Sequence, residues 1–328
     1  MEADKINLKK WNKTATIKGN KINFKKIVYK FIILILLNSL NFFFFWIRNI
    51  KNTKKIIKNE ININDNVCID IKNKIIKRTQ PLDFENELLF FTDLIMCKIP
   101  FSFSRFNDGE NAIMKGYKFN APKDNWYWEN KNKEFQNSLI KSSSICTNLN
   151  SFIGIPCKNW KSISKSILSF SKCSSAKYMS YATLFINKNY PLFKKWILQF
   201  INTSNRWKII LVANSIINKD IRWAYKFFPV PDHLIENWEK YKISLLPKLS
   251  NQAKENDLIF FISAGPAANI IVSHLTKINN KNIYIDFGSS IEFITKGYTT
   301  RAYAKNGKTS YQSCEPFFIQ NKSLIYTR

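Results

Sequence analysis

Residues 258–288 read LIFFISAGPAANIIVSHLTKINNKNIYIDFG, and this stretch decides the fold that the sequence predicts. The run Asp257–Ser263 is almost continuously apolar, as is typical of a strand buried on both faces. Pro266 can occupy the first turn of a helix over Ala267–Lys277, and Asn282–Asp286 is a second buried strand. Such strand–helix–strand units need a crossover and usually build parallel sheets. We therefore expect an α/β fold, a Rossmann-like parallel sheet flanked by helices, with its site at the carboxyl ends of the strands.

The same alternation of apolar patterns extends back to Pro81, where we expect the globular part, residues 81–328, to begin. The expected helices lie at 83–98, from Gly109 onward, at Lys131–Ser142, at Pro191–Ile201 and at Asp232–Leu249. The expected strands lie at Phe101–Phe106, Asn150–Pro156, Lys177–Ile186, Lys208–Ala213 and Phe227–Val230. Residues 126–128, Trp-Tyr-Trp, are expected in a loop.

An uncharged apolar segment, Phe31–Ile47, precedes this globular part. As a helix, its 17 residues would be about 26 Å long, near the lower limit for a membrane span. A buried core helix and a cleaved signal peptide are the alternatives. We expect a basic tail over 1–30, a single-pass anchor over 31–47 and a stem over 48–80. The excess of lysines before the anchor favours a cytosolic N-terminus.

The composition restricts the class of protein. The chain has 328 residues, a formal charge of +28 and 45% hydrophobic residues, which is enough apolar material for a core. Lysine is spread along the whole chain together with Asn and Ile, which favours a coding bias over a clustered nucleic-acid surface. The six cysteines form no CxxC pair and there are two histidines, so a structural zinc site is not expected. One or two disulfides are compatible with a luminal domain.

The stretch 101–116, FSFSRFNDGENAIMKG, carries the strongest chemical signal. Asp108 and Glu110 stand where an apolar strand ends and a helix begins. Acidic residues there often cap the helix. They can also bind Mg²⁺ or Mn²⁺, which take one or two carboxylates together with substrate phosphates. Arg105 suits a bidentate contact to phosphate, with a surface salt bridge as the simpler alternative.

Three further places suit ligands. The turn at Gly265 and Pro266 starts a helix after a buried strand, where free N–H groups favour phosphate. Asp286, at the end of a strand and two residues before Gly288, can act as a base, a ribose ligand or a metal ligand. Trp126 offers an aromatic face for stacking on a base or a sugar. A plain turn, a loop-capping Asp and a packed surface Trp are the respective structural alternatives.

Together these residues resemble the GT-D-fold glycosyltransferase family. Its Arg-Phe-Gly-Asp-Gly-Glu type signature is matched by Arg105-Phe106-Asn107-Asp108-Gly109-Glu110, and its late Gly-Pro and Asp-x-Gly unit by residues 258–288. Between them, Phe228-Pro229-Val230-Pro231-Asp232 stands in place of a Pro-rich strand end, so that the resemblance covers residues 85–293. The chain departs from the family at Asn107, where glycine is usual, and at Ser289, where many members have histidine.

The resemblance implies a divalent metal, Mn²⁺ or Mg²⁺, and a nucleotide-sugar donor, often UDP-linked. Asp108 and Glu110 would be the metal and donor-diphosphate residues. Asp286 would be a base or would orient the acceptor, whose nature (glycan, protein or lipid) is open. Arg105, Gly265, Pro266, Gly288 and Trp126 would be substrate-binding residues.

We therefore expect a membrane-anchored glycosyltransferase that transfers a sugar to a hydroxyl group. Two other classes stay open. One is a Rossmann-like enzyme of another class, such as a methyltransferase, since IDFGSS at 285–290 resembles the first motif of that class but lacks its second glycine. The other is a non-catalytic basic protein that binds nucleic acid or an anionic membrane surface.

Overall fold

A computed structural model describes residues 65–122, 126–129, 131–145, 150–171, 173, 175–203, 207–215, 220–299, 301–304 and 313–315, together with two short strands near the N-terminus. These two strands, β1 (Thr16–Ile17) and β2 (Asn20–Lys21), pair antiparallel within a separate unit of residues 1–58. The expected anchor, Phe31–Ile47, lies outside the described residues. Among the residues that are described, no helix has the length and apolar character needed to cross a membrane.

Within the unit 59–328, seven of the described strands form one sheet in which every neighbouring pair is parallel. In spatial order they are β7 (Met179–Tyr181), β6 (Ser151–Ile155), β3 (Phe101–Arg105), β11 (Ile283–Asp286), β10 (Leu258–Ile262), β8 (Lys208–Asn214) and β9 (Lys226–Val230). The expected α/β fold with a parallel sheet is confirmed. The unit at 258–288 supplies two adjacent central strands, β10 and β11, as its sequence predicts.

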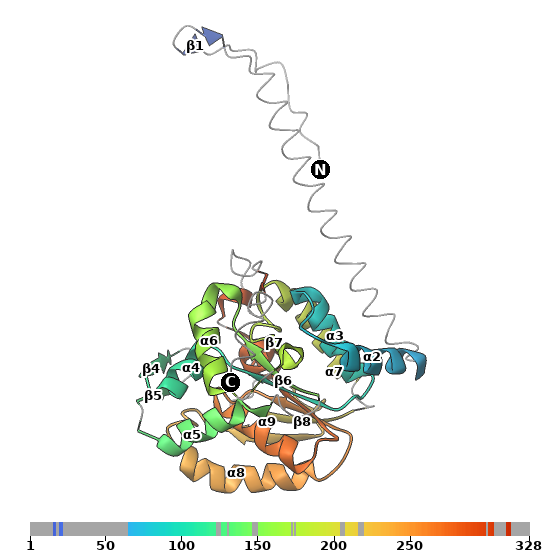
Figure 1. The fold of residues 1–328 in the computed structure, drawn as a ribbon, viewed down its shortest axis with the longest axis vertical. Helices are drawn as coiled ribbons and strands as arrows, with labels where there is room; N and C mark the ends of the chain where they lie inside the picture. Colours follow the sequence, from blue (N-terminus) through green and yellow to red (C-terminus); the bar gives the residue numbers. More distant parts are fainter. Residues whose placement is uncertain are drawn as a thin grey trace, which may run out of the picture. The chain divides into compact units, whose positions relative to one another are not determined.

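Helices cover both faces of the sheet (Figure 1). One face carries α4 (Asp108–Lys115), α5 (Lys133–Ser142), α6 (Lys161–Phe170), α8 (Trp238–Ala253) and α9 (Ala267–Ile278). The other face carries α3 (Phe84–Met96) and α7 (Tyr190–Asn202). Burial on both faces explains why β6, β10 and β11 are buried at every position.

Aromatic side chains fill the layer beneath α3 and α7. Phe91 of α3 contacts Phe101, Phe103 and Phe152 on the sheet, with ring centroids 5.0–5.4 Å apart. Phe200 of α7 contacts Phe261 of β10. Tilted, edge-on and offset-stacked aromatic pairs each add about 0.5–1.5 kcal/mol beyond the burial of apolar area.

Two sequence-based boundaries were wrong. The expected strand Lys177–Ile186 is reduced to β7, because the chain makes hydrogen-bonded turns after Tyr181. The expected helix Asp232–Leu249 begins only at Trp238. His233 has a φ of +56°, a left-handed backbone conformation that does not fit a right-handed α-helix. The chain therefore continues as turns from Asp232 until the helix begins at Trp238.

Two further elements lie where no regular structure was expected. The expected loop 126–128 is instead β5 (Trp126–Trp128), which pairs antiparallel with β4 (Phe119–Ala121). Residues 65–77, within the expected stem, form α2 (Asp65–Lys77).

A buried ion pair fixes the chain just after α2. Arg78 donates to both carboxylate oxygens of Glu87, at 2.9 and 2.6 Å, and to the backbone carbonyls of Lys177 and Met179. Glu87 is fully buried. Because each charged group is paired and hydrogen-bonded, these interactions offset the desolvation cost of burying the two charges. It ties α2 and α3 to the outer edge of the sheet at β7.

A disulfide joins Cys157, just after β6, to Cys314 near the C-terminus. The α-carbons are 5.3 Å apart, and the two positions are 157 apart in the sequence. The neighbouring backbone is also paired, since Lys158 N–H donates to Glu315 O at 3.0 Å. Residues 313–315 are thereby held at the end of the sheet where β6 terminates.

We predict that replacing both cysteines, Cys157→Ser with Cys314→Ser, lowers the free energy of unfolding by about 2–5 kcal/mol, because the cross-link restricts the unfolded chain. Urea denaturation of the double variant against Cys173→Ser, a free thiol in this structure, provides the measurement and its control. Equal stability of the double variant and the oxidised wild type would contradict the pairing.

Candidate active site

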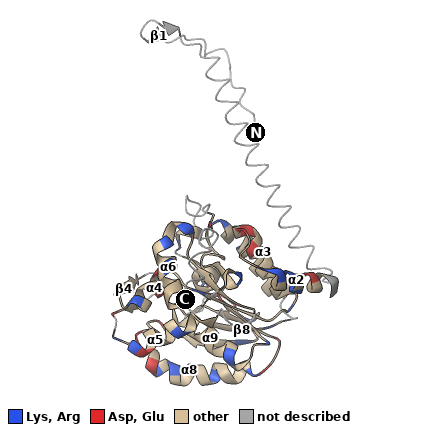
Figure 2. Cartoon of the chain, in the orientation of Figure 1, with Lys and Arg blue, Asp and Glu red and all other residues tan. Residues whose placement is uncertain are grey.

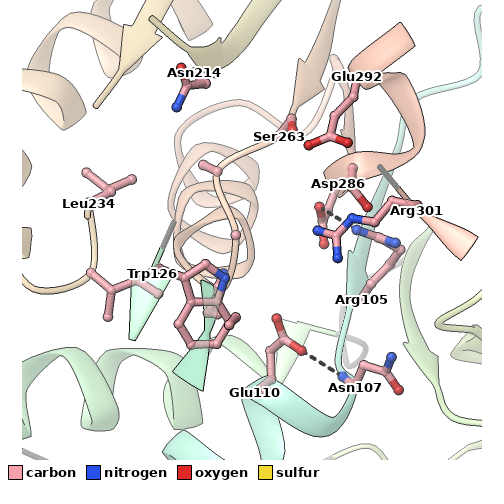
Figure 3. A pocket seen from close by; sticks show the side chains of 18 of the residues that line it. Arg105, Asn107, Glu110, Trp126, Asn214, Leu234, Ser263, Asp286, Glu292 and Arg301 are labelled. Carbon is pink, nitrogen blue, oxygen red and sulfur yellow. Dashed lines mark hydrogen bonds and ion pairs between the residues drawn. The ribbon is translucent and has the colours of Figure 1, made fainter. Parts of the chain in front are cut away.

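A cavity of about 610 Å³ opens at the carboxyl edge of the sheet. Its walls come from the residues that end or follow six strands of the sheet, β7, β3, β11, β10, β8 and β9, and from the β4–β5 hairpin. Figure 3 shows Arg105, Asp286 and Arg301 reaching toward one another in it, with Glu110 at the start of its helix and with Asn214 and Leu234 on the opposite wall. The position matches the expected site of an open α/β sheet.

Arg105 and Asp286 form the central ion pair of the cavity. They are the last residues of the adjacent strands β3 and β11, and Nη2 of the arginine lies 3.3 Å from Oδ1 of the aspartate. Asp286 is 3% exposed. Burial raises the pKa of its carboxyl group, and the guanidinium of Arg105 acts in the opposite direction. The sequence predicted both residues, and the structure brings them together although they are 181 positions apart.

Gly288 makes room for this ion pair. A methyl group on its α-carbon would lie 1.8 Å from Nη2 of Arg105, and its φ is +50°. Both observations favour glycine, because any larger residue would displace the guanidinium and strain the backbone. The role of Gly288 is therefore to admit Arg105 to the site.

Glu110 caps its own helix and also faces the cavity. One carboxylate oxygen accepts the backbone N–H of Asn107 at 2.9 Å, which completes a capping box at the start of α4. The other oxygen points toward the cavity (Figure 3). Burial raises the pKa of Glu110 to about 7, with a smaller contribution in the same direction from Asp286.

Asp108 lines the same cavity from the first residue of α4. Its charge also acts on Arg301, whose pKa it raises against the larger lowering by burial. Asp108 and Glu110 therefore both line the cavity at the carboxyl edge of the sheet.

Trp126 forms a wall between the start of a helix and a backbone turn. Its ring stacks on Phe119 of the neighbouring strand, with centroids 5.2 Å apart. A methyl group at Gly109 would lie 2.9 Å from this indole, and one at Gly265 would lie 3.6 Å from its Nε1. The Trp126 ring thus covers both the start of α4 and the Gly265–Pro266 turn before α9, and all these residues line the cavity.

Sequence reasoning missed several residues of the cavity. Asn214, at the end of β8, donates to Asp232 at 2.5 Å on the wall formed by β8 and β9. Its position at the end of an apolar strand is the sequence signal that could have identified Asn214 as a site residue. Arg301 and Glu292 come from the region after the last strand, where no periodic pattern precedes them. His233, which was given no role, also lines the cavity.

The charge balance of the cavity is opposite to that of the chain. Five acidic residues line it against three basic ones, whereas Lys and Arg are spread over the outside of the helices (Figure 2). The acidic residues are Asp108, Glu110, Asp232, Asp286 and Glu292, and the basic ones are Arg105, Lys296 and Arg301. Buried carboxylates without enough positive partners are unfavourable unless they are protonated or bind a cation.

The carboxylates of the cavity can hold a divalent cation only if a substrate supplies further oxygen ligands. No group of three or more His, Cys, Asp or Glu side chains with the geometry of a metal site occurs in the described part of the chain. Asp108 and the cavity-facing oxygen of Glu110 offer two carboxylates. Mg²⁺ commonly takes one or two protein carboxylates and fills its other positions with water and phosphate oxygens.

We predict that Gly288→Ala lowers the free energy of unfolding by at least about 2 kcal/mol more than Gly265→Ala does, because only the former breaks a buried ion pair. The two glycines are a matched pair: both have positive φ, but nothing lies closer than 3.6 Å to a methyl group at Gly265. Chemical denaturation of both variants measures the difference. Equal destabilisation would show that Arg105 is not held against Gly288.

We predict a pH-dependent contribution to stability from Glu110 in metal-free protein. A folded-state pKa near 7, against 4.5 in the unfolded chain, stabilises the fold below about pH 4.5 and loses that stabilisation as pH rises through 7. The loss is at most about 3 kcal/mol. Glu110→Gln keeps an acceptor for the cap, so the variant should gain stability relative to wild type between pH 5 and pH 8 in EDTA. If the stabilities of the wild type and of Glu110→Gln changed with pH in the same way, the raised pKa of Glu110 would be contradicted.

No family model matches the chain, and neither does any curated protein. Two solved structures are similar to it. One, described as "The highly conserved domain of unknown function 1792 has a distinct glycosyltransferase fold", is 16% identical, with a TM-score of 0.44 over 70% of this chain and 85% of that chain. The other, a selenomethionine-substituted structure of the same kind of domain, is 17% identical, with a TM-score of 0.45 over 77% of this chain and 96% of that chain.

Proposed function

We propose that this chain is a metal-dependent glycosyltransferase that moves a sugar from a nucleotide-sugar donor, UDP-linked in the first instance, to a hydroxyl group. The observation that carries the proposal is the meeting of two distant motifs in one cavity. Arg105, Asp108 and Glu110 come from the first motif, whereas Gly265 and Asp286 come from the last. The family resemblance rests on these same residues, and their convergence supports it.

Asp108 and Glu110 would hold Mn²⁺ or Mg²⁺ together with the donor diphosphate. The cation would neutralise charge that develops on the departing nucleotide diphosphate. Cation binding would also favour the ionised form of Glu110, whose pKa burial raises to about 7. Capping leaves one oxygen of Glu110 for this purpose.

The chain's own residues would orient the reactants. Arg105 would contact the diphosphate, since a guanidinium presents paired N–H donors to phosphate oxygens. Asp286 would accept the proton of the acceptor hydroxyl or orient that hydroxyl, and burial raises the pKa of its carboxyl toward the range useful for a base. Trp126 would offer its ring to the nucleoside or the sugar, while Gly265 and Pro266 would shape the nucleotide side.

We propose a single-pass membrane protein with a cytosolic N-terminus and the catalytic unit on the opposite side. The apolar segment at 31–47 and the basic residues before it support this placement. The Cys157–Cys314 disulfide also supports it, because such bonds persist in oxidising compartments. The acceptor would be a glycan, a protein or a lipid.

We predict that the full chain hydrolyses a UDP-sugar, or transfers its sugar to an acceptor, in the presence of Mn²⁺ or Mg²⁺. The reaction should stop in EDTA. Asp108→Asn and Glu110→Gln should each lower turnover by at least about 100-fold, because each removes a negative charge from the cation site. Glu239→Gln, an exposed glutamate on α8, is the matched control and should keep wild-type turnover. Release of UDP measures the reaction.

Wild-type turnover in either site variant would contradict the metal role. Two outcomes would favour the other classes of protein. Thermal stabilisation by S-adenosylmethionine, with none by UDP-sugars and Mn²⁺, would indicate a methyltransferase. Steeply salt-dependent binding of RNA or DNA without UDP release would indicate a basic nucleic-acid-binding protein.

A further inference from the structure

Arg301 brings a second guanidinium into the cavity from the C-terminal part of the chain. It lies beyond β11 and α10 (Glu292–Thr295), and outside residues 85–293, over which the family resemblance extends. Figure 3 shows its side chain directed toward Arg105 and Asp286. Both arginines line the cavity. A residue with no counterpart in the recognised motifs therefore reaches the centre of the site.

The backbone that carries Arg301 is anchored on both sides. On one side, the hydroxyl of Thr299 donates to Glu292 at 3.2 Å and accepts the backbone N–H of Arg301 at 3.2 Å. On the other, Tyr303 is 8% exposed and its ring lies 4.8 Å from that of Tyr190. These contacts place Arg301 before any substrate binds, which limits the entropy that binding would cost.

Ser289 takes part in this anchoring. Its hydroxyl lies 3.1 Å from the hydroxyl of Tyr303, at hydrogen-bond distance. Ser289 also stands at the position where many members of the family that this chain resembles have histidine. In this chain, the residue after Gly288 is thus joined to the segment that presents Arg301.

Two guanidinium groups in one recessed cavity repel each other. Burial lowers the pKa of Arg301, and the charge of Arg105 lowers it further. Asp286 pairs with Arg105, and the charge of Asp108 acts on Arg301 in the opposite direction to that of Arg105. An anion between the two guanidiniums would relieve their repulsion and receive paired N–H donors from both.

We propose that Arg301 and Arg105 together bind a phosphate or diphosphate group of the substrate, and that Tyr303 is the positioning residue for Arg301. Identifying that group as the diphosphate of a nucleotide sugar rests on the proposed function. Binding of the anion by the two arginines does not.

The test uses the full chain and inorganic pyrophosphate, titrated calorimetrically in EDTA so that no metal contributes. Arg301→Ala should weaken pyrophosphate binding at least about tenfold, as expected for loss of a charge-assisted hydrogen bond. Arg301→Lys should recover part of the loss, because it keeps the charge but not the paired donors. Arg222→Ala, at an exposed arginine paired with Asp220, is the matched control and should bind as wild type does.

Tyr303→Phe tests the positioning role. The ring can still pack against Tyr190 while the hydrogen bond to Ser289 is lost, and Ser289→Ala removes the same bond from the other side. Both variants should weaken pyrophosphate binding by the same factor, with an unchanged unfolding midpoint. If the variants lost stability but kept their affinity for pyrophosphate, the contact between Tyr303 and Ser289 would be purely structural and the positioning role would be overturned.

The outcomes separate this inference from the proposed function. If Arg301→Ala lowers pyrophosphate affinity but the wild type turns over no nucleotide sugar, the arginine pair stands and the glycosyltransferase assignment falls. If the wild type turns over a nucleotide sugar and Arg301→Ala binds pyrophosphate as the wild type does, the assignment stands and the arginine pair falls. Failure of the wild type to bind pyrophosphate would also overturn the inference.

Discussion

The ion pair between Arg105 and Asp286 is the contact on which the organisation of the site depends. It joins the ends of β3 and β11, two strands that are neighbours in space but separated by most of the folded unit. Only a parallel sheet brings their carboxyl ends to one edge, and only a glycine at 288 leaves room for the guanidinium. The fold, the late Gly-containing turn and the first motif are therefore linked through one buried charge pair.

The parts of the fold that could be predicted from sequence are those with strong local signals. The continuous apolar runs of β8, β10 and β11 identify buried strands, and burial on both faces identifies a parallel sheet. The site residues at the ends of these strands followed from the same reasoning. The start of α8 could not be located in this way, because the left-handed backbone at His233 depends on the turn that follows β9 rather than on its own propensity.

Residues that tertiary contacts bring into the cavity could not be identified from local sequence patterns. Arg301 is one basic residue in a chain with 51 lysines and arginines, and nothing beside it predicts a strand end. Its place in the cavity depends on Tyr303 meeting Tyr190 and Ser289. Trp126 was expected at the site but in a loop, and its antiparallel pairing with the strand that carries Phe119 instead fixes the ring over Gly109 and Gly265. Only side-chain packing between distant segments determines such positions.

Helix capping and cation binding, which the sequence presents as alternatives for Glu110, are compatible in this geometry. A carboxylate has two oxygens, and the capping box at α4 uses one of them. That hydrogen bond fixes the side-chain rotamer and so directs the second oxygen toward the cavity that Asp286 and Arg105 also line (Figure 3). Burial keeps the carboxyl poorly solvated, which raises its pKa to about 7 and makes a positive partner favourable. In the proposed function, the cap would pre-organise a cation ligand, and a helix start that looks purely structural in the sequence would supply part of the charge that binds a metal–diphosphate complex.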